Sequence, residues 1–246
     1  MSAGHPDAFP ATRPSIVRAI RSADSTARER ALDALTRAYW RPVYAYIRVR
    51  FGRTAEDAQD LTQEFFTRVL EHDSLAAYDP SRARFRTFLR VCLDRFLANE
   101  HRDEGRLKRG GSVRIEPLNL AAFDGELARH PIAVDNDPER WFHREWVRGL
   151  FAAAVDALAA RAAHEQRDLA LALFRRYDLD DDAGPERPSY AALARSFEVS
   201  VNDVTNQLAW ARRTFRAIML ERLRELCDSD EEFRREARDL LGPGAA

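Results

Sequence analysis

Apolar residues recur at three- and four-residue spacing through most of this 246-residue chain, and this period constrains the fold more than any other feature. Such spacing places apolar side chains on one face of an α-helix, whereas a half-buried β-strand alternates every second residue. The period holds in residues 14–102 and again in residues 141–226. The sequence therefore predicts an all-α protein with two helical domains.

The helical period is lost between these regions, where residues 103–140 are punctuated by glycine and proline. We expect this segment to be a flexible linker. Residues 1–13 are small, polar and proline-containing, and are expected to form a disordered tail. Residues 227–246 are expected to form a short acidic helix and a tail.

Local signals predict where helices of the first domain begin and end. Asp24 or Ser25 can cap a long helix, and Gly52 can end it. Pro42 lies within this helix and is expected to kink or split it, because proline lacks a backbone donor. Thr54 can cap the next helix.

Charge changes sign abruptly along the first domain, although the net charge of the whole chain is only -1. Residues 54–73 contain six acids and one arginine, whereas residues 82–114 contain ten bases and four acids. Adjacent segments of opposite charge indicate two different partners, one basic and one carrying phosphates.

The acidic segment places Asp57, Asp60 and Glu64 together on one helix face, at positions i, i+3 and i+7. Uncompensated like charges at this spacing destabilise a helix slightly, which favours a basic partner for the face. A solvated acidic surface without a partner is the alternative.

The basic segment predicts a long helix that begins at Phe85 and carries aromatic, arginine and asparagine side chains. This mixture is typical of surfaces that bind unpaired bases by stacking and phosphates by charge. The alternative is that Phe85 and Phe88 are ordinary core residues. The candidate DNA-binding residues here are Arg82, Arg84, Phe85, Arg86, Thr87, Phe88, Asn99 and Arg102.

Residues 189–216 have the layout of a helix-turn-helix, with Ser200 as the cap of the second helix. Val204, Leu208 and Ala211 would face the core. The outward-facing candidates for DNA contact are Asn202, Thr205, Asn206, Gln207, Arg212 and Arg213. A helix hairpin without DNA contact is the alternative.

Four segments, taken together and in this order, resemble bacterial RNA polymerase sigma factors of the sigma-70 class, specifically the extracytoplasmic-function (ECF) type. Residues 60–66 (DLTQEFF) resemble the core-polymerase-binding helix of that family, and residues 39–44 resemble the helix before it. Residues 85–89 (FRTFL) look like the promoter-melting segment, and residues 189–215 are similar to the region that reads the upstream promoter element.

The resemblance implies a region 2 bundle and a region 4 helix-turn-helix, with core RNA polymerase and promoter DNA as partners. It implies that Asp57, Asp60, Gln63 and Glu64 dock on a basic coiled coil of the polymerase. The loop at residues 79–84 and the helix start at residues 85–88 would accept an unstacked base of the non-template strand. Asn99 and Arg102 would contact the downstream promoter element. The polar face of residues 202–207, with Arg212 and Arg213, would contact the upstream element.

One departure from the family pattern concerns the polymerase-binding helix, where Gln59 stands in place of a common glutamate. We hypothesise that phosphorylation of Thr62 restores the missing negative charge and switches polymerase binding on. A Ser/Thr kinase is therefore a candidate partner, and so is an anti-sigma factor.

Other classes of function have little support in the sequence. We expect no enzyme and no cofactor, because there is no glycine-rich phosphate loop and no nucleophile elbow. No metal site is expected from the two distant cysteines, which together with the lack of a long apolar run indicate a cytoplasmic protein without a membrane segment. The alternatives are a helix-turn-helix regulator that never engages polymerase and a sigma-like scaffold.

Overall fold

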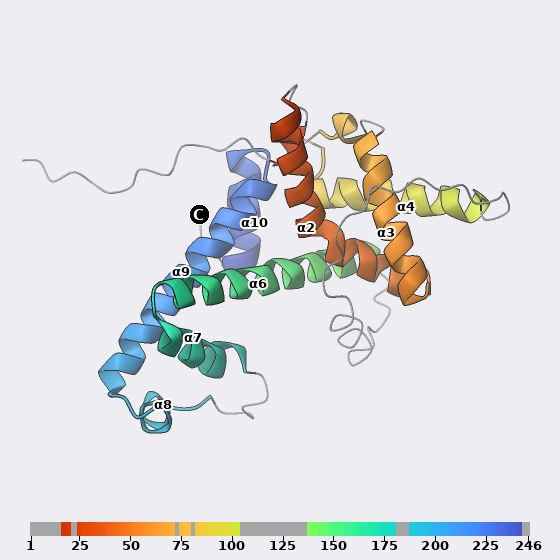
Figure 1. The fold of residues 1–246 in the computed structure, drawn as a ribbon. Helices are drawn as coiled ribbons and strands as arrows, with labels where there is room; N and C mark the ends of the chain where they lie inside the picture. The colour runs from red at the N-terminus through yellow and green to blue at the C-terminus, as the bar shows by residue number, and fades with distance from the viewer. Residues whose placement is uncertain are drawn as a thin grey trace, which may run out of the picture. The chain divides into compact units, whose positions relative to one another are not determined.

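The computed structural model describes residues 16–20, 24–71, 74–79, 82–103, 137–180 and 187–242. These residues form helices and contain no strand (Figure 1). The all-α prediction is confirmed for this part of the chain. The expected tail at residues 1–13, and residues 104–136 of the expected linker, lie outside the described residues.

Contacts divide the chain into two compact units, the first made of residues 1–147 and 224–246 and the second of residues 148–223. The division falls inside two long helices, α6 (Pro138–His164) and α9 (Val201–Leu226). The acidic helix expected near the end of the sequence is α10 (Asp230–Leu241), and it belongs to the first unit.

The first unit contains the described helices that precede α6, together with the start of α6, the last residues of α9 and the whole of α10. Those earlier helices are α1 (Ile16–Ile20), α2 (Ser25–Arg50), α3 (Ala55–Glu71), the 3-10 helix η1 (Ser74–Ala77) and α4 (Phe85–Asp103).

Most of the predicted helix ends are confirmed. The Asp24 carboxylate accepts hydrogen bonds from the backbone of Thr26 and caps α2. Gly52 follows the end of α2 with a φ of 59°, the left-handed conformation that glycine adopts readily. The Thr54 hydroxyl accepts a hydrogen bond from the Asp57 amide at 3.1 Å, as expected for the cap of α3.

Pro42 does not split α2, which runs without interruption from Ser25 to Arg50. Of the two outcomes expected at Pro42, a kink or a split, the split is therefore wrong. Pro42 is itself buried, as are Trp40 and Val43, so packing around the proline offsets the hydrogen bond that it cannot donate.

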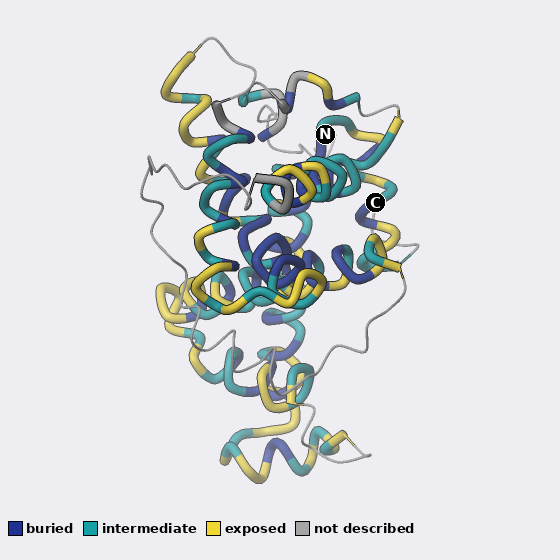
Figure 2. The backbone as a smooth tube through the Cα atoms, turned by 90° about the vertical axis from the view of Figure 1, so that its right-hand side faces the viewer, coloured by how far each residue is buried: buried dark blue, intermediate teal, exposed yellow. Residues whose placement is uncertain are grey.

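Aromatic rings from α2 form the centre of the first unit. Tyr39 packs edge-on against Phe85 of α4 at 5.6 Å between ring centroids and stacks on Trp146 of α6 at 6.4 Å. Two helical turns after Tyr39, Tyr46 contacts the rings of Trp141 and Phe142, and its hydroxyl donates to Asp94 at 2.8 Å. Figure 2 shows the buried stretches that result along these helices.

The second unit contains the rest of α6, α7 (Asp168–Phe174), the π-helix η2 (Arg175–Leu179), α8 (Tyr190–Ser196) and most of α9. Phe215 of α9 packs against Phe151 and Phe174, with centroids 5.0 Å and 5.3 Å away. These contacts join α6, α7 and α9 around one small apolar core.

We predict that Leu93→Ala in α4 lowers the free energy of unfolding by about 2–5 kcal/mol, because Leu93 is fully buried and truncation leaves a cavity. The control is Arg95→Ala in the same helix, whose exposed side chain should change stability by less than about 0.5 kcal/mol. Urea unfolding followed by circular dichroism measures both. Equal unfolding midpoints would contradict the assignment of this helix face to the core.

Candidate functional site

The polar face of α3, comprising Asp57, Asp60, Gln63 and Glu64, is held outward by the opposite face of the helix. Ala58 and Phe65 are buried on that opposite face. Asp57 and Asp60 are exposed, whereas Gln63 and Glu64 are half-buried. The Thr54 hydroxyl donates to the Asp57 carboxylate at 2.8 Å, which fixes one acid at the start of the helix.

Neutralisation of this face is uneven along α3. Glu64 pairs with Arg68 at 2.6 Å, and Arg68 also reaches Glu100 of α4 at 2.8 Å. Asp60 forms no ion pair with any residue that the structure describes. The uncompensated charge therefore lies in the first turns of α3, at Asp57 and Asp60.

Thr62 lies on the buried side of α3, with no exposed surface. Its hydroxyl donates to the carbonyl oxygen of Ala58, one turn earlier, at 2.6 Å. The hypothesis of phosphorylation at Thr62 thus meets an obstacle, because a kinase must reach the hydroxyl. Thr67 makes the same type of bond, to Gln63 at 3.0 Å, but is only half-buried.

The start of α4 carries the basic, aromatic segment, and its first ring is a core residue. Phe85 is 2% exposed and lies between the rings of Tyr39 and Tyr78, at 5.6 Å and 5.1 Å. Of the two interpretations of Phe85, the burial favours a core role. Phe88 is half-buried beside Tyr78, which leaves part of its surface accessible.

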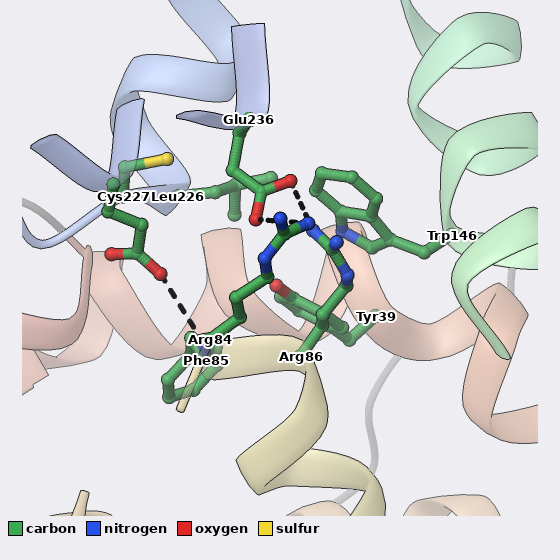
Figure 3. A pocket seen from close by; sticks show the side chains of 9 residues that line it. Tyr39, Arg84, Phe85, Arg86, Trp146, Leu226, Cys227 and Glu236 are labelled. Carbon is green, nitrogen blue, oxygen red and sulfur yellow. Dashed lines mark hydrogen bonds and ion pairs between the residues drawn. The ribbon is translucent and has the colours of Figure 1, made fainter. Parts of the chain in front are cut away.

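Two arginines of this segment, Arg84 and Arg86, are bound to α10, a contact that the sequence did not indicate. Arg84 pairs with Asp239 at 2.7 Å and with Glu236 at 3.4 Å. Arg86 is 8% exposed and pairs with Glu236, while its guanidinium lies 5.2 Å from the centre of the Trp146 ring. Figure 3 shows both arginines directed toward Glu236.

Glu232, one turn before Glu236, completes the contact. It accepts from the Tyr78 hydroxyl at 3.2 Å and from the Phe85 amide at 3.4 Å. Burial raises the pKa of Tyr78 above its usual range, and the Glu232 carboxylate raises it further. Glu232, Glu236 and Phe85 line a pocket with Tyr39, Leu226 and Cys227 (Figure 3).

The remaining candidates at α4 have other partners or are exposed. Arg82 is exposed and pairs with Asp79 at 3.2 Å, and the Thr87 hydroxyl donates to Glu139 at 2.5 Å. Asn99 is exposed on the last turns of α4. Arg102 belongs to the same helix, but its side chain lies outside the described part.

In the second unit, α8 and α9 each begin at a serine cap, and the cap at Ser200 is the one that the sequence predicts. The Ser189 hydroxyl accepts from the Ala192 amide, and the Ser200 hydroxyl accepts from the Asp203 amide, both at 3.1 Å. Hydrogen bonds from Ser200 also lower the pKa of the Asp203 carboxyl. Val204, Leu208 and Ala211 are fully buried, as predicted, and form the inner face of α9.

The outward residues of α9 divide into exposed and engaged groups. Asn202, Thr205, Asn206 and Arg213 are exposed, and Gln207 is half-buried. Arg212 binds both carboxylate oxygens of Asp178, at 2.9 Å and 3.0 Å, and donates to the Tyr190 hydroxyl. These hydrogen bonds, Asp178 first, raise the pKa of Arg212 above its usual range. Arg212 therefore braces η2 and α8 against α9 instead of pointing freely outward.

The family comparison falls on the first unit. Residues 35–107 match the family model of sigma-70 region 2. The matched residues include both the polar face of α3 and the start of α4. It does not extend to α8, α9 or α10. No curated protein and no solved structure matches the chain.

Within the part of the chain that the structure describes, no group of histidine, cysteine and acidic side chains could hold a metal ion. No helix in the described ranges combines the length and the apolar character that a bilayer crossing demands.

We predict that Thr62→Glu lowers the free energy of unfolding by about 3 kcal/mol or more, because it places a carboxylate without a partner at a buried position. Thr67→Glu is the matched control, since it adds the same charge to the same helix at a half-buried position. Thermal and urea unfolding measure the difference. Equal stability of the two variants would show that Thr62 is accessible enough to carry a negative group.

Proposed function

We propose that this chain is a sigma factor of the sigma-70 class and of the ECF type, acting in the cytoplasm. The observation that carries the proposal is the region 2 match at residues 35–107, which coincides with an exposed acidic helix face followed by a basic, aromatic helix start. A sigma factor needs these two surfaces, one for core RNA polymerase and one for promoter DNA.

In this proposal the polar face of α3 binds a basic surface of core polymerase. Asp57 and Asp60 are exposed in the first turns of the helix, where uncompensated carboxylates attract a basic partner most strongly. Gln63 and Glu64 extend the surface by another turn. The half-buried Glu64 is oriented by Arg68, so it arrives at the interface in a fixed position.

The start of α4 is proposed to hold the opened promoter strand. Phe88 is the aromatic side chain with accessible surface for stacking on an unpaired base, and Phe85 supports it from the core at 6.2 Å between ring centroids. Arg82, Arg84 and Arg86 supply positive charge for phosphates. Asn99 and Arg102, further along α4, are proposed to contact the downstream promoter element.

The second unit is proposed to bind the upstream promoter element through the first turns of α9. Asn202, Thr205 and Asn206 are exposed there, and amide and hydroxyl side chains at the start of a recognition helix can reach base edges in the major groove. Gln207 adds a half-buried amide, and Arg213 is available for a phosphate. Arg212 acts indirectly, by fixing η2 and α8 against α9.

Two forms of control complete the proposal. An anti-sigma factor could cover the polar face of α3. A Ser/Thr kinase could modify Thr62, which requires α3 to separate locally from its neighbours because the hydroxyl is buried. Phosphorylation would then add charge beside Asp60 and Gln63.

We predict that Asp60→Ala/Glu64→Ala weakens binding to purified bacterial core polymerase by at least about tenfold, since it removes charges from the proposed interface. The matched control is Glu29→Ala/Asp33→Ala on α2, which removes two exposed acids, one of them also paired with an arginine four residues on. Binding is measured by surface plasmon resonance. Retained affinity in the α3 variant would argue for a regulator that does not engage polymerase.

Transcription from supercoiled genomic fragments tests the whole function. Core polymerase with this protein is expected to produce discrete start sites that core polymerase alone does not produce. Alignment of these starts would give the promoter elements. Absence of new starts, despite tight polymerase binding, would count against initiation without a further activating step.

A further inference from the structure

Three acids of α10 lie on one face of that helix and contact Tyr78 and residues 84–86, where the opened strand is proposed to bind. Glu232, Glu236 and Asp239 are spaced i, i+4 and i+7. Glu236 and Glu232 are 3% and 4% exposed, an unusual degree of burial for carboxylates. Ion pairing and hydrogen bonding to the start of α4 account for this burial.

The contact engages the groups that a nucleic acid would need. Arg84 is held by Asp239 and Glu236, Arg86 by Glu236, and the Phe85 amide by Glu232 (Figure 3). Carboxylates and phosphates compete for guanidinium groups because both offer paired oxygens. While α10 is docked, these donors cannot bind a DNA backbone.

The way α10 is attached makes it exchangeable. Of its apolar residues only Ala237 is fully buried, whereas Phe233, Leu240 and Leu241 are half-buried. Most of the interface therefore consists of ion pairs, of which Arg86–Glu236 is buried and Arg84–Asp239 is partly exposed. The attraction within a buried pair is largely offset by the cost of removing charges from water, and an exposed pair contributes little. A partner that supplies other anions to Arg84 and Arg86 can replace α10 at little net cost.

The connection between α9 and α10 permits such a movement. α9 ends at Leu226 and α10 begins at Asp230, so three non-helical residues separate them. Ser229 caps α10, with its hydroxyl accepting from the Glu232 amide at 3.1 Å. The helix start is thus stabilised by its own residues and does not need α4.

We infer that α10 is an autoinhibitory lid, whose carboxylates occupy the phosphate positions at Arg84 and Arg86, so that DNA binding to the start of α4 requires α10 to leave. The inference rests on the proposed function for the identity of the competing ligand. It adds a regulatory element outside the matched region, at residues 230–241.

The first experiment compares Glu236→Gln/Asp239→Asn with Glu231→Gln/Glu29→Gln. The second pair also removes two negative charges, but from exposed side chains of α10 and α2 that do not pair with Arg84 or Arg86. The probe is a fluorescent single-stranded DNA oligonucleotide of mixed sequence, and anisotropy is measured over a range of salt concentrations with the full chain. Circular dichroism establishes that both variants are folded.

The lid variant is expected to bind several-fold more tightly than the wild type. Its log–log salt slope should be steeper by about 1.4, because two arginines gain phosphates at roughly 0.7 each for a single strand. The control variant should keep the wild-type slope. Equal changes in both variants, no change in the lid variant, or no binding by any of the proteins would overturn the lid.

Hydrogen exchange on the wild-type chain tests the same movement without a substitution. Amides of residues 230–241 should lose protection when saturating oligonucleotide is added, whereas those of α2 should not. Unchanged or increased protection of α10 would mean that it is a fixed brace. Binding of core polymerase by the same proteins separates the two claims. If the wild-type chain does not bind core polymerase, the sigma-factor proposal is refuted, whereas the hydrogen-exchange result still decides whether α10 is a lid.

Discussion

Burial of Tyr39 is the interaction on which the first unit depends. Its ring contacts Phe85 of α4 and Trp146 of α6, so one side chain of α2 holds two other helices in place. Burial raises the pKa of Tyr39 well above its ordinary value, which means that the phenol remains neutral within the core. Because Phe85 is the first residue of α4, this packing also fixes where the basic segment begins, and hence where Arg84 and Arg86 lie.

The helices and many of their ends were predictable because they depend on nearby residues. Asp24, Thr54 and Ser200 cap the next turn of their own chain, and Val204, Leu208 and Ala211 follow one helical face. The split, one of the two outcomes expected at Pro42, does not occur because packing around the proline offsets the hydrogen bond that it cannot donate. The local sequence shows the missing backbone donor of Pro42, but not the packing that offsets it.

The candidate site was less predictable, because its decisive contacts join residues far apart in the sequence. Arg86 and Glu236 are separated by 150 positions, and nothing near either one specifies the other. The i, i+4, i+7 spacing of Glu232, Glu236 and Asp239 was a usable signal of an acidic face, but not of its destination. Arg212 is similar, since Asp178 lies 34 residues before it. The opposite charges along the sequence thus identify partners inside the molecule as well as outside it.

Cys227 gives the junction before α10 a chemical property of its own. The thiol is 4% exposed, and burial raises its pKa above the usual range, with Glu232 and Glu236 raising it further. Only a thiolate reacts rapidly with alkylating reagents, so this cysteine is inert while α10 is docked. Separation of α10 would remove both causes at once. The chain therefore contains a native reporter of that movement, readable by the rate at which a single sulfur atom is alkylated.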